Sequence, residues 1–123
     1  MKFRYARHTK DLKALEKFYT EILELEVLGG FQNHDEYDGL FLGLKNENWH
    51  LEFTTSPEIP NQIIDEDDLM VFYPKNQEEL NKITANISKN NIKIHQPKNP
   101  YWQENGILIK DPDQYGVIIS KNF

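Results

Sequence analysis

The sequence repeats itself at about half its length. Five residues recur 65 positions later: Asp11, Leu15, Phe18, Ile22 and Val27 correspond to Asn76, Leu80, Ile83, Ile87 and Ile92. Residues 38–42 then match residues 105–109 at a spacing of 67, so two extra residues lie in a loop of the second half. A repeat of this length predicts two similar modules related by a pseudo-twofold axis.

Hydrophobic patterning gives the first half the order strand, helix, strand, strand, strand. Alternation predicts a strand over residues 3–8. Thr9 then supplies a capping hydroxyl and Asp11 a first-turn acid for a helix whose apolar stripe ends at Ile22. Further strands are predicted over residues 25–31, 40–44 and 49–55, with Gly29 and Gly30 marking a bulge. Residues 32–38 read as a polar turn.

The second half repeats this order after a linker. Strands are predicted over residues 69–73, 92–95, 106–110 and 115–121, and Asn76 with Glu79 forms a capping box at the start of the helix. The acidic run at residues 65–68 is expected to be a solvated loop. We therefore expect one domain, with module one at 1–55, a linker at 56–68 and module two at 69–123. The predicted fold is α+β, two βαβββ modules that form a half-open, cupped eight-stranded sheet with the helices outside.

The side chains that alternate with the helix-facing ones point into the predicted cleft, which is a common place for a small-molecule site. Parity assigns Arg4, Ala6 and His8 to this face from the first strand. His50, Glu52 and Thr54 join them from the fourth strand, and Leu69, Val71 and Tyr73 from the fifth.

Charge and cysteine content exclude several classes of function. The 123 residues carry 20 acidic and 14 basic side chains, a formal net charge of −6, and no basic stripe, which argues against nucleic-acid binding. The absence of cysteine excludes a thiol nucleophile and a Cys-based zinc site. The charged N-terminus and the lack of a long apolar run predict neither a signal peptide nor a membrane span, so we expect a cytoplasmic protein.

Two motifs link the chain to a known superfamily. Lys10-Asp11-Leu12 opens a helix that continues to residues 18–23 and is followed by the motif at residues 25–28. Asp111-Pro112-Asp113-Gln114-Tyr115 forms a hairpin near the end. Together they resemble the vicinal-oxygen-chelate superfamily of glyoxalase I, extradiol dioxygenases and bleomycin-resistance proteins. Gln114 stands where the superfamily usually has glycine. Residues 6–9, 50–54, 99–102 and 105–106 narrow the resemblance to a little-characterised bacterial subgroup, from which His8 departs because proline is frequent there.

The resemblance implies four metal-ligand positions, which in this chain are Arg4, Glu52, Leu69 and Ile118. Only Glu52 offers a ligand atom, since leucine and isoleucine have none and arginine repels a cation. We therefore expect no metal and no other cofactor. If a divalent metal does bind at a rebuilt site, its ligands are expected to be His8, His50 and Glu52.

The remaining candidates each allow two interpretations. Arg4 and Glu52 bind a polar ligand or form a structural ion pair, and His50 with Glu52 forms an acid–base pair or is only hydrogen-bonded. Tyr101 and Trp102, expected on a loop, stack on a ligand or plug the barrel, and Tyr73 adds a hydroxyl. His34 is interpreted as a solvated loop residue and His95 is given no role.

Three functions remain open. The first is a metal-free protein that binds an aromatic, amphipathic or carboxylate-bearing small molecule, as the bleomycin-resistance branch does. The second is a lyase, isomerase or dioxygenase of the superfamily that uses the rebuilt metal site or the Glu52–His50 pair. In the third, the cleft is vestigial and the partner is another protein. The resemblance also implies a homodimer.

Overall fold

Asp11 and Asn76, which correspond in the repeat, both cap a helix in the computed structural model, which describes residues 1–123. The Asp11 carboxylate accepts a hydrogen bond from the Ala14 amide at 3.0 Å, and the Asn76 side chain accepts one from the Glu79 amide at 2.9 Å. The cap of the first helix is therefore Asp11, and the prediction of Thr9 as the cap is wrong. The chain forms two units, residues 1–62 and 63–123. Each is described by itself below.

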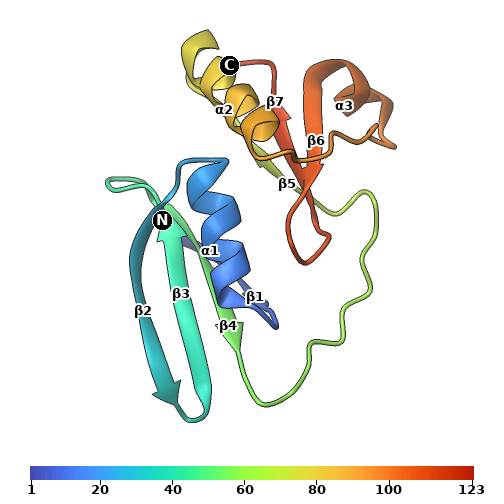
Figure 1. The fold of residues 1–123 in the computed structure, drawn as a ribbon. Coiled ribbons are helices and arrows are strands. Elements are labelled where there is room, and N and C mark those ends of the chain that lie inside the picture. Colours follow the sequence, from blue (N-terminus) through green and yellow to red (C-terminus); the bar gives the residue numbers. More distant parts are fainter. The chain divides into compact units, whose positions relative to one another are not determined.

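The first unit is a four-stranded sheet with one helix on it. Its elements are β1 (Phe3–His8), α1 (Leu12–Glu21), β2 (Glu26–His34), β3 (Tyr37–Gly43) and β4 (Trp49–Thr55). The strand order is β1-β4-β3-β2, with β1 and β4 parallel and the other pairs antiparallel. Figure 1 shows α1 lying across one face of this sheet.

Aromatic packing holds α1 on that face. Leu15 and Tyr19 of the helix are fully buried, and the Tyr19 ring stacks on Phe53 of β4 with centroids 5.4 Å apart. Leu51 is also buried, whereas its neighbours His50 and Glu52 are only partly so. The predicted alternation along β4 is therefore confirmed, and it separates a helix-facing side of the sheet from an opposite one.

The second unit is a three-stranded sheet with two helices. Its elements are β5 (Leu69–Phe72), α2 (Gln77–Lys89), α3 (Pro100–Asn105), β6 (Gly106–Lys110) and β7 (Gly116–Ser120). The order β5-β7-β6 repeats the order β1-β4-β3 of the first unit, with the same parallel and antiparallel pairs (Figure 1). Leu80, Ile83 and Ile87 form the buried stripe of α2.

The predicted α+β class and the repeat are confirmed, but several local predictions are wrong. The structure has seven strands and not eight, because residues 92–95 make only one bridge, from His95 to Leu108. Tyr101 and Trp102 lie in a helix and not in a loop, because Asn99 caps α3 and Pro100 occupies its first turn.

The third wrong prediction is the polar turn at residues 32–38. Polar residues continue β2 as far as His34, and β3 already begins at Tyr37. Asp35 and Glu36 make the connection with φ values of 53° and 72°, as a two-residue hairpin turn requires. The bulge predicted at Gly29 is confirmed by a register shift between Val27 and Gly29. No helix of the structure is long and apolar enough to cross a membrane.

Candidate functional site

The parallel pairing of β1 with β4 brings three of the predicted residues together. Arg4 lies opposite His50 and Ala6 opposite Glu52. The Arg4 guanidinium donates from Nε to His50 Nε2 at 2.9 Å, and its terminal nitrogen lies 3.5 Å from a Glu52 carboxylate oxygen. Arg4 remains half exposed, with Glu52 at 14%. The predicted Arg4–Glu52 pair is therefore formed, and His50 completes it.

Aromatic rings continue this cluster across the sheet. The Arg4 guanidinium lies over the Phe41 ring of β3, 5.0 Å from its centroid. Phe41 is 5.7 Å from the His50 ring on one side and 5.9 Å from the Phe31 ring on the other, centroid to centroid. We call the side of the sheet opposite α1, which carries Arg4, Phe31, Phe41, His50 and Glu52, the open face.

Gly39 makes room for the outer ring of this row. A Cβ at Gly39 would lie 2.2 Å from the Phe31 ring, so only glycine lets that ring lie flat on β3. His34, expected in a solvated loop, ends β2 instead, and its ring is 6.2 Å from Phe31. The row therefore runs from His34 through Phe31 and Phe41 to His50.

His50 is held as a neutral imidazole. Its Nε2 accepts the Arg4 hydrogen bond, so the proton of the neutral ring is on Nδ1. Burial lowers the pKa of His50, and the charges of Arg4 and Lys2 lower it further, against an opposing effect of Glu52. At neutral pH the cluster therefore contains one cation, one carboxylate and one neutral ring.

His8 takes no part in this cluster. It lies opposite Thr54, and its Nε2 shares a hydrogen bond of 3.0 Å with the Ser56 hydroxyl. Four residues of strand separate it from Arg4, roughly 13 Å at the usual rise. The three side chains expected as a rebuilt metal site, His8, His50 and Glu52, are thus not brought together, and no group of three or more His, Asp or Glu side chains could hold a metal ion.

The four positions that correspond to metal ligands in the superfamily do not fit a metal. Arg4 presents a cation that is already bonded to His50 and near Glu52, so the one carboxylate faces a guanidinium. In the second unit, Leu69 packs against Gly116 and Ile118 is fully buried, and neither side chain has a donor atom.

The predicted aromatic residues of the second module lie in the second unit. Tyr73 follows β5 and is 64% exposed. The rings of Tyr101 and Trp102 pack edge to face, with centroids 4.8 Å apart, and Trp102 lies against Gly106 at the start of β6. Trp102 thus packs on its own sheet, while Tyr101 stays more than half exposed.

Sequence reasoning missed Phe31 and Phe41. The signal for Phe41 was present, since it alternates with the buried Leu40 and Leu42 and so shares the open face. Phe31 could not be found in this way because the bulge between Val27 and Gly29 shifts the parity of β2.

Known proteins similar to this chain agree with the two-unit fold. Residues 3–54 match the YycE-like N-terminal domain, and residues 67–121 match the YycE-like C-terminal domain. The uncharacterised protein YycE of Bacillus subtilis (strain 168) is 37% identical over 121 residues, which cover 94% of this chain and 84% of that protein.

Solved structures extend the similarity. YycE from Bacillus subtilis, a protein of unknown function, superposes with a TM-score of 0.89 at 34% identity, covering 99% of this chain and 90% of that one. Glyoxalase I from Leishmania major gives 0.72 at 22% identity, covering 95% and 83%. The fosfomycin resistance protein FosX from Listeria monocytogenes gives 0.71 at 14% identity, covering 98% and 90%, and these two show a common fold. The chain belongs to the YycE-like family, within the vicinal-oxygen-chelate superfamily.

Proposed function

We propose that the protein binds a small molecule carrying an aromatic ring and a carboxylate on the open face of its first sheet. The observation that carries this proposal is that Arg4 is held in one orientation while its side chain stays exposed. Its guanidinium is held by His50 and Glu52 and supported by the Phe41 ring, yet half of the side chain is exposed. A side chain that is oriented before binding loses little entropy when a ligand arrives.

The donors of Arg4 suit a carboxylate. A guanidinium has five N–H groups, and the contacts with His50 and Glu52 involve Nε and one terminal nitrogen, so the two N–H groups of the other terminal nitrogen remain. The remaining donors can make the paired hydrogen bonds that a planar carboxylate accepts. FosX from Listeria monocytogenes, which shares the fold, is complexed with Mn(II) and a dihydroxypropylphosphonic acid. The fold therefore accommodates a small anion in at least one protein.

The ring row suits the aromatic part. Phe31 and Phe41 are only partly buried, and their centroids are 5.9 Å apart. Rings at this spacing offer a surface on which a flat ligand can stack. Leu28 of the β2 bulge adds an apolar edge, since its side chain lies 3.0 Å from a Cβ built on Gly43.

Titration with 2-naphthoate, followed by amide chemical shifts, tests the proposal. We expect shifts centred on Arg4, Phe41 and His50, and roughly tenfold weaker binding for Arg4→Met, because one charge-assisted pair is lost. Lys13→Met is the matched control on the helix side of the same unit. Phe41→Leu should also weaken binding, whereas Phe3→Ala, which removes an exposed ring from the opposite face of β1, should not. Equal affinities of the wild type and Arg4→Met would overturn the proposal.

A second candidate is catalysis by His50 and Glu52, which share one face of β4. Its support is the lowered pKa of His50, because a neutral imidazole can accept a proton at pH 7. The Nε2 lone pair is, however, occupied by Arg4, so ligand binding is the better-supported function. Turnover of an α-ketoaldehyde with glutathione, lost in Glu52→Gln, would instead establish the enzyme.

We also infer from the superfamily resemblance that two chains assemble as a homodimer. Analytical ultracentrifugation tests this directly. A single species of twice the 14.6 kDa chain mass is expected, and a species of one chain mass at micromolar concentration would contradict it.

A further inference from the structure

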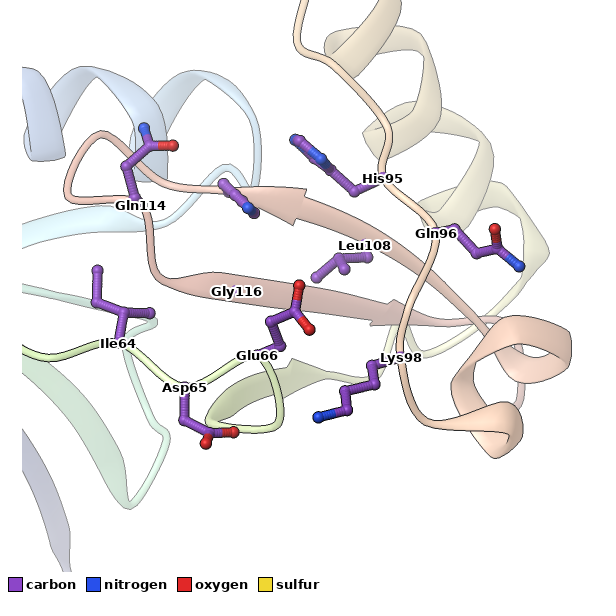
Figure 2. Close-up of a pocket in the computed structure, with 10 residues that line it drawn as sticks. Ile64, Asp65, Glu66, His95, Gln96, Lys98, Leu108, Gln114 and Gly116 are labelled. Carbon is purple, nitrogen blue, oxygen red and sulfur yellow. The ribbon is translucent and has the colours of Figure 1, made fainter.

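A pocket of about 280 Å³ lies within the second unit (Figure 2). Its lining comes from strands β6 and β7, the turn between them, the segment before α3 and the end of the linker. The lining residues are Ile64, Asp65, Glu66, His95, Gln96, Lys98, Leu108, Lys110, Gln114 and Gly116. This volume is near the lower end of what small-molecule sites occupy.

The repeat shows which residues of the second unit replace the cluster of the first sheet. Leu69 pairs with Gly116 in the second unit, as Arg4 pairs with His50 in the first. Gly116 also pairs with Lys110, as His50 pairs with Gly43. In the second unit, Gly116 therefore stands at the position of His50, and Lys110 stands at the position of Gly43. A Cβ at Gly116 would lie 2.6 Å from the Leu69 side chain, so Leu69 fills the space beside Gly116, and Gly116 lines the pocket with its backbone.

The walls of the pocket are held in place by the chain around them. The His95 amide donates to the Leu108 carbonyl at 2.8 Å, which joins the segment before α3 to β6. The Gln103 side chain donates to the Pro97 carbonyl at 2.8 Å and holds the residue next to Lys98. Both ends of residues 95–98 are thus positioned before any ligand binds.

Gln114, which lines the pocket, has a strained backbone conformation. It has φ 74°, in the left-handed region that favours glycine. Asp111 forces this turn, since its carbonyl accepts from the Gln114 amide at 2.8 Å and its carboxylate accepts from the Asp113 amide at 2.9 Å. A side chain kept in a strained position that glycine would relieve points to a role for its amide group.

The charges of the pocket favour an anion. Lys98 and Lys110 line it, and neither forms an ion pair in the structure. Of the two acids, Asp65 is engaged in its own turn, where its carboxylate accepts from the Asp67 amide at 2.8 Å, and it points away from the sheet in Figure 2. Burial lowers the pKa of His95, and the nearby Lys110 and Lys93 lower it further, so its ring is neutral. The two unpaired lysines therefore stand against two carboxylates, those of Glu66 and Asp65, and one oxygen of Asp65 is already engaged in its own turn.

We propose that this pocket is a second ligand site, for a short-chain aliphatic carboxylate. The carboxylate lies between the ammonium groups of Lys98 and Lys110 and accepts a hydrogen bond from the Gln114 amide. The alkyl chain lies over Leu108 and Gly116. The site is built from the second unit and the open face from the first, whose proposed ligand is aromatic, and neither proposal depends on the other.

Titration with hexanoate, followed by amide chemical shifts of the full chain, tests the site. Shifts should centre on residues 95–98 and 108–116, and hexylamine should not bind. Lys98→Met and Lys110→Met should each weaken hexanoate about tenfold, through loss of a charge-assisted hydrogen bond. Lys93→Met removes the same charge from the same segment outside the pocket and should leave the affinity within about twofold. Glu66→Gln should tighten binding because it removes the repelling carboxylate.

Three results would overturn the inference: hexylamine binding as tightly as hexanoate, unchanged affinity in both lysine variants, or shifts confined to the first unit. The last result would leave the first-sheet site standing and remove only this one. Binding of hexanoate without binding of 2-naphthoate would leave this site standing and remove only the first-sheet site.

Gln114→Gly separates function from folding. Relief of the left-handed strain should raise the melting temperature by about 3–6 °C. Loss of the amide group should weaken hexanoate about fivefold. A variant that is more stable and binds hexanoate as well as the wild type would show that Gln114 has no part in the site.

Discussion

Arg4 is held in a fixed orientation, which is unusual for an exposed arginine. An exposed arginine on an edge strand is normally free to move, but Nε is bonded to His50 and the guanidinium plane rests on Phe41. The ion pair with Glu52 adds little stability by itself, because its nitrogen–oxygen distance is 3.5 Å and the Arg4 side chain is half exposed. The consequence of the arrangement is orientation, and it depends on His50 staying neutral.

His50 should therefore make the protein sensitive to acid. Because its pKa is lowered in the folded chain, its contribution to stability is complete above pH 6.5, the ordinary value, and is lost as the pH falls through the folded value. We expect the melting temperature of the wild type to drop more between pH 7.5 and 5.5 than that of His50→Gln, which cannot titrate.

His34→Gln is the control for this experiment, since it removes a histidine from the same face of the same sheet. It should keep the wild-type pH dependence. A Cε1–H resonance of His50 that titrates above pH 6.5 would contradict the prediction directly.

The two helices show how strongly the repeat governs local structure. Both begin at a polar cap from the same repeat position, and both caps bond the amide three residues on. In the second helix the Glu79 carboxylate bonds the Lys75 amide at 2.6 Å and not that of Asn76, so the predicted capping box is displaced by one residue. Asn76 still caps the helix, because the Glu79 amide donates a hydrogen bond to the Asn76 side chain.

Removal of either cap should cost about 1 kcal/mol of unfolding free energy, because an amide of the first turn loses its partner. Asn76→Ala and Asp11→Ala are the variants, and urea denaturation is the measurement. Ser88→Ala, on an exposed position of α2, should be neutral or slightly stabilising. An Asn76→Ala variant as stable as the wild type would show that the Asn76 bond contributes nothing.

The β2–β3 pair carries a second test, because Phe31 lies on Gly39. Gly39→Ala should cost about 1–3 kcal/mol, since the new Cβ cannot coexist with the ring 2.2 Å away. Phe31→Ala removes the ring, so the double variant Gly39→Ala/Phe31→Ala should be more stable than the sum of the two single changes predicts. Strict additivity in urea denaturation would mean that the two residues do not share the space.

For the molecule as a whole, the repeat has kept its topology while its two copies diverged in chemistry. The first sheet carries a cation, a carboxylate and a ring row, and the second carries leucine, glycine and isoleucine at the corresponding positions. The metal set of the superfamily cannot be assembled from these residues.

Purified protein should therefore contain no stoichiometric metal. Zn²⁺, Mn²⁺, Ni²⁺ and Fe²⁺ should shift the melting temperature by less than about 1 °C, since a ligand that does not bind the native state cannot stabilise it. Mass spectrometry of the elements in purified protein is the measurement. One equivalent of any of these metals, lost in Glu52→Ala, would contradict both the donor analysis and the proposed function.

How far the site could be predicted follows from how regular its strands are. β1 and β4 alternate without interruption, so parity alone identified Arg4, His50 and Glu52 as neighbours on one face. β2 is interrupted by a bulge, so the alternation of its sequence did not place Phe31 on this face. His95 was given no role because it was expected near the edge of the second module. A single bridge, which leaves no periodic pattern in the sequence, places it beside Leu108.

The sequence by itself determined the repeat, the class of fold, the two long helices and the face of β4 that carries polar residues. These depend on local periodicity and on hydrogen bonds between residues a few positions apart. Only the tertiary structure decided that Arg4 bonds His50, that Phe31 lies on Gly39 and that residues 95–98 line a pocket with β6 and β7. Each of these depends on the register of strands far apart in the chain, and register is set by packing across the whole sheet.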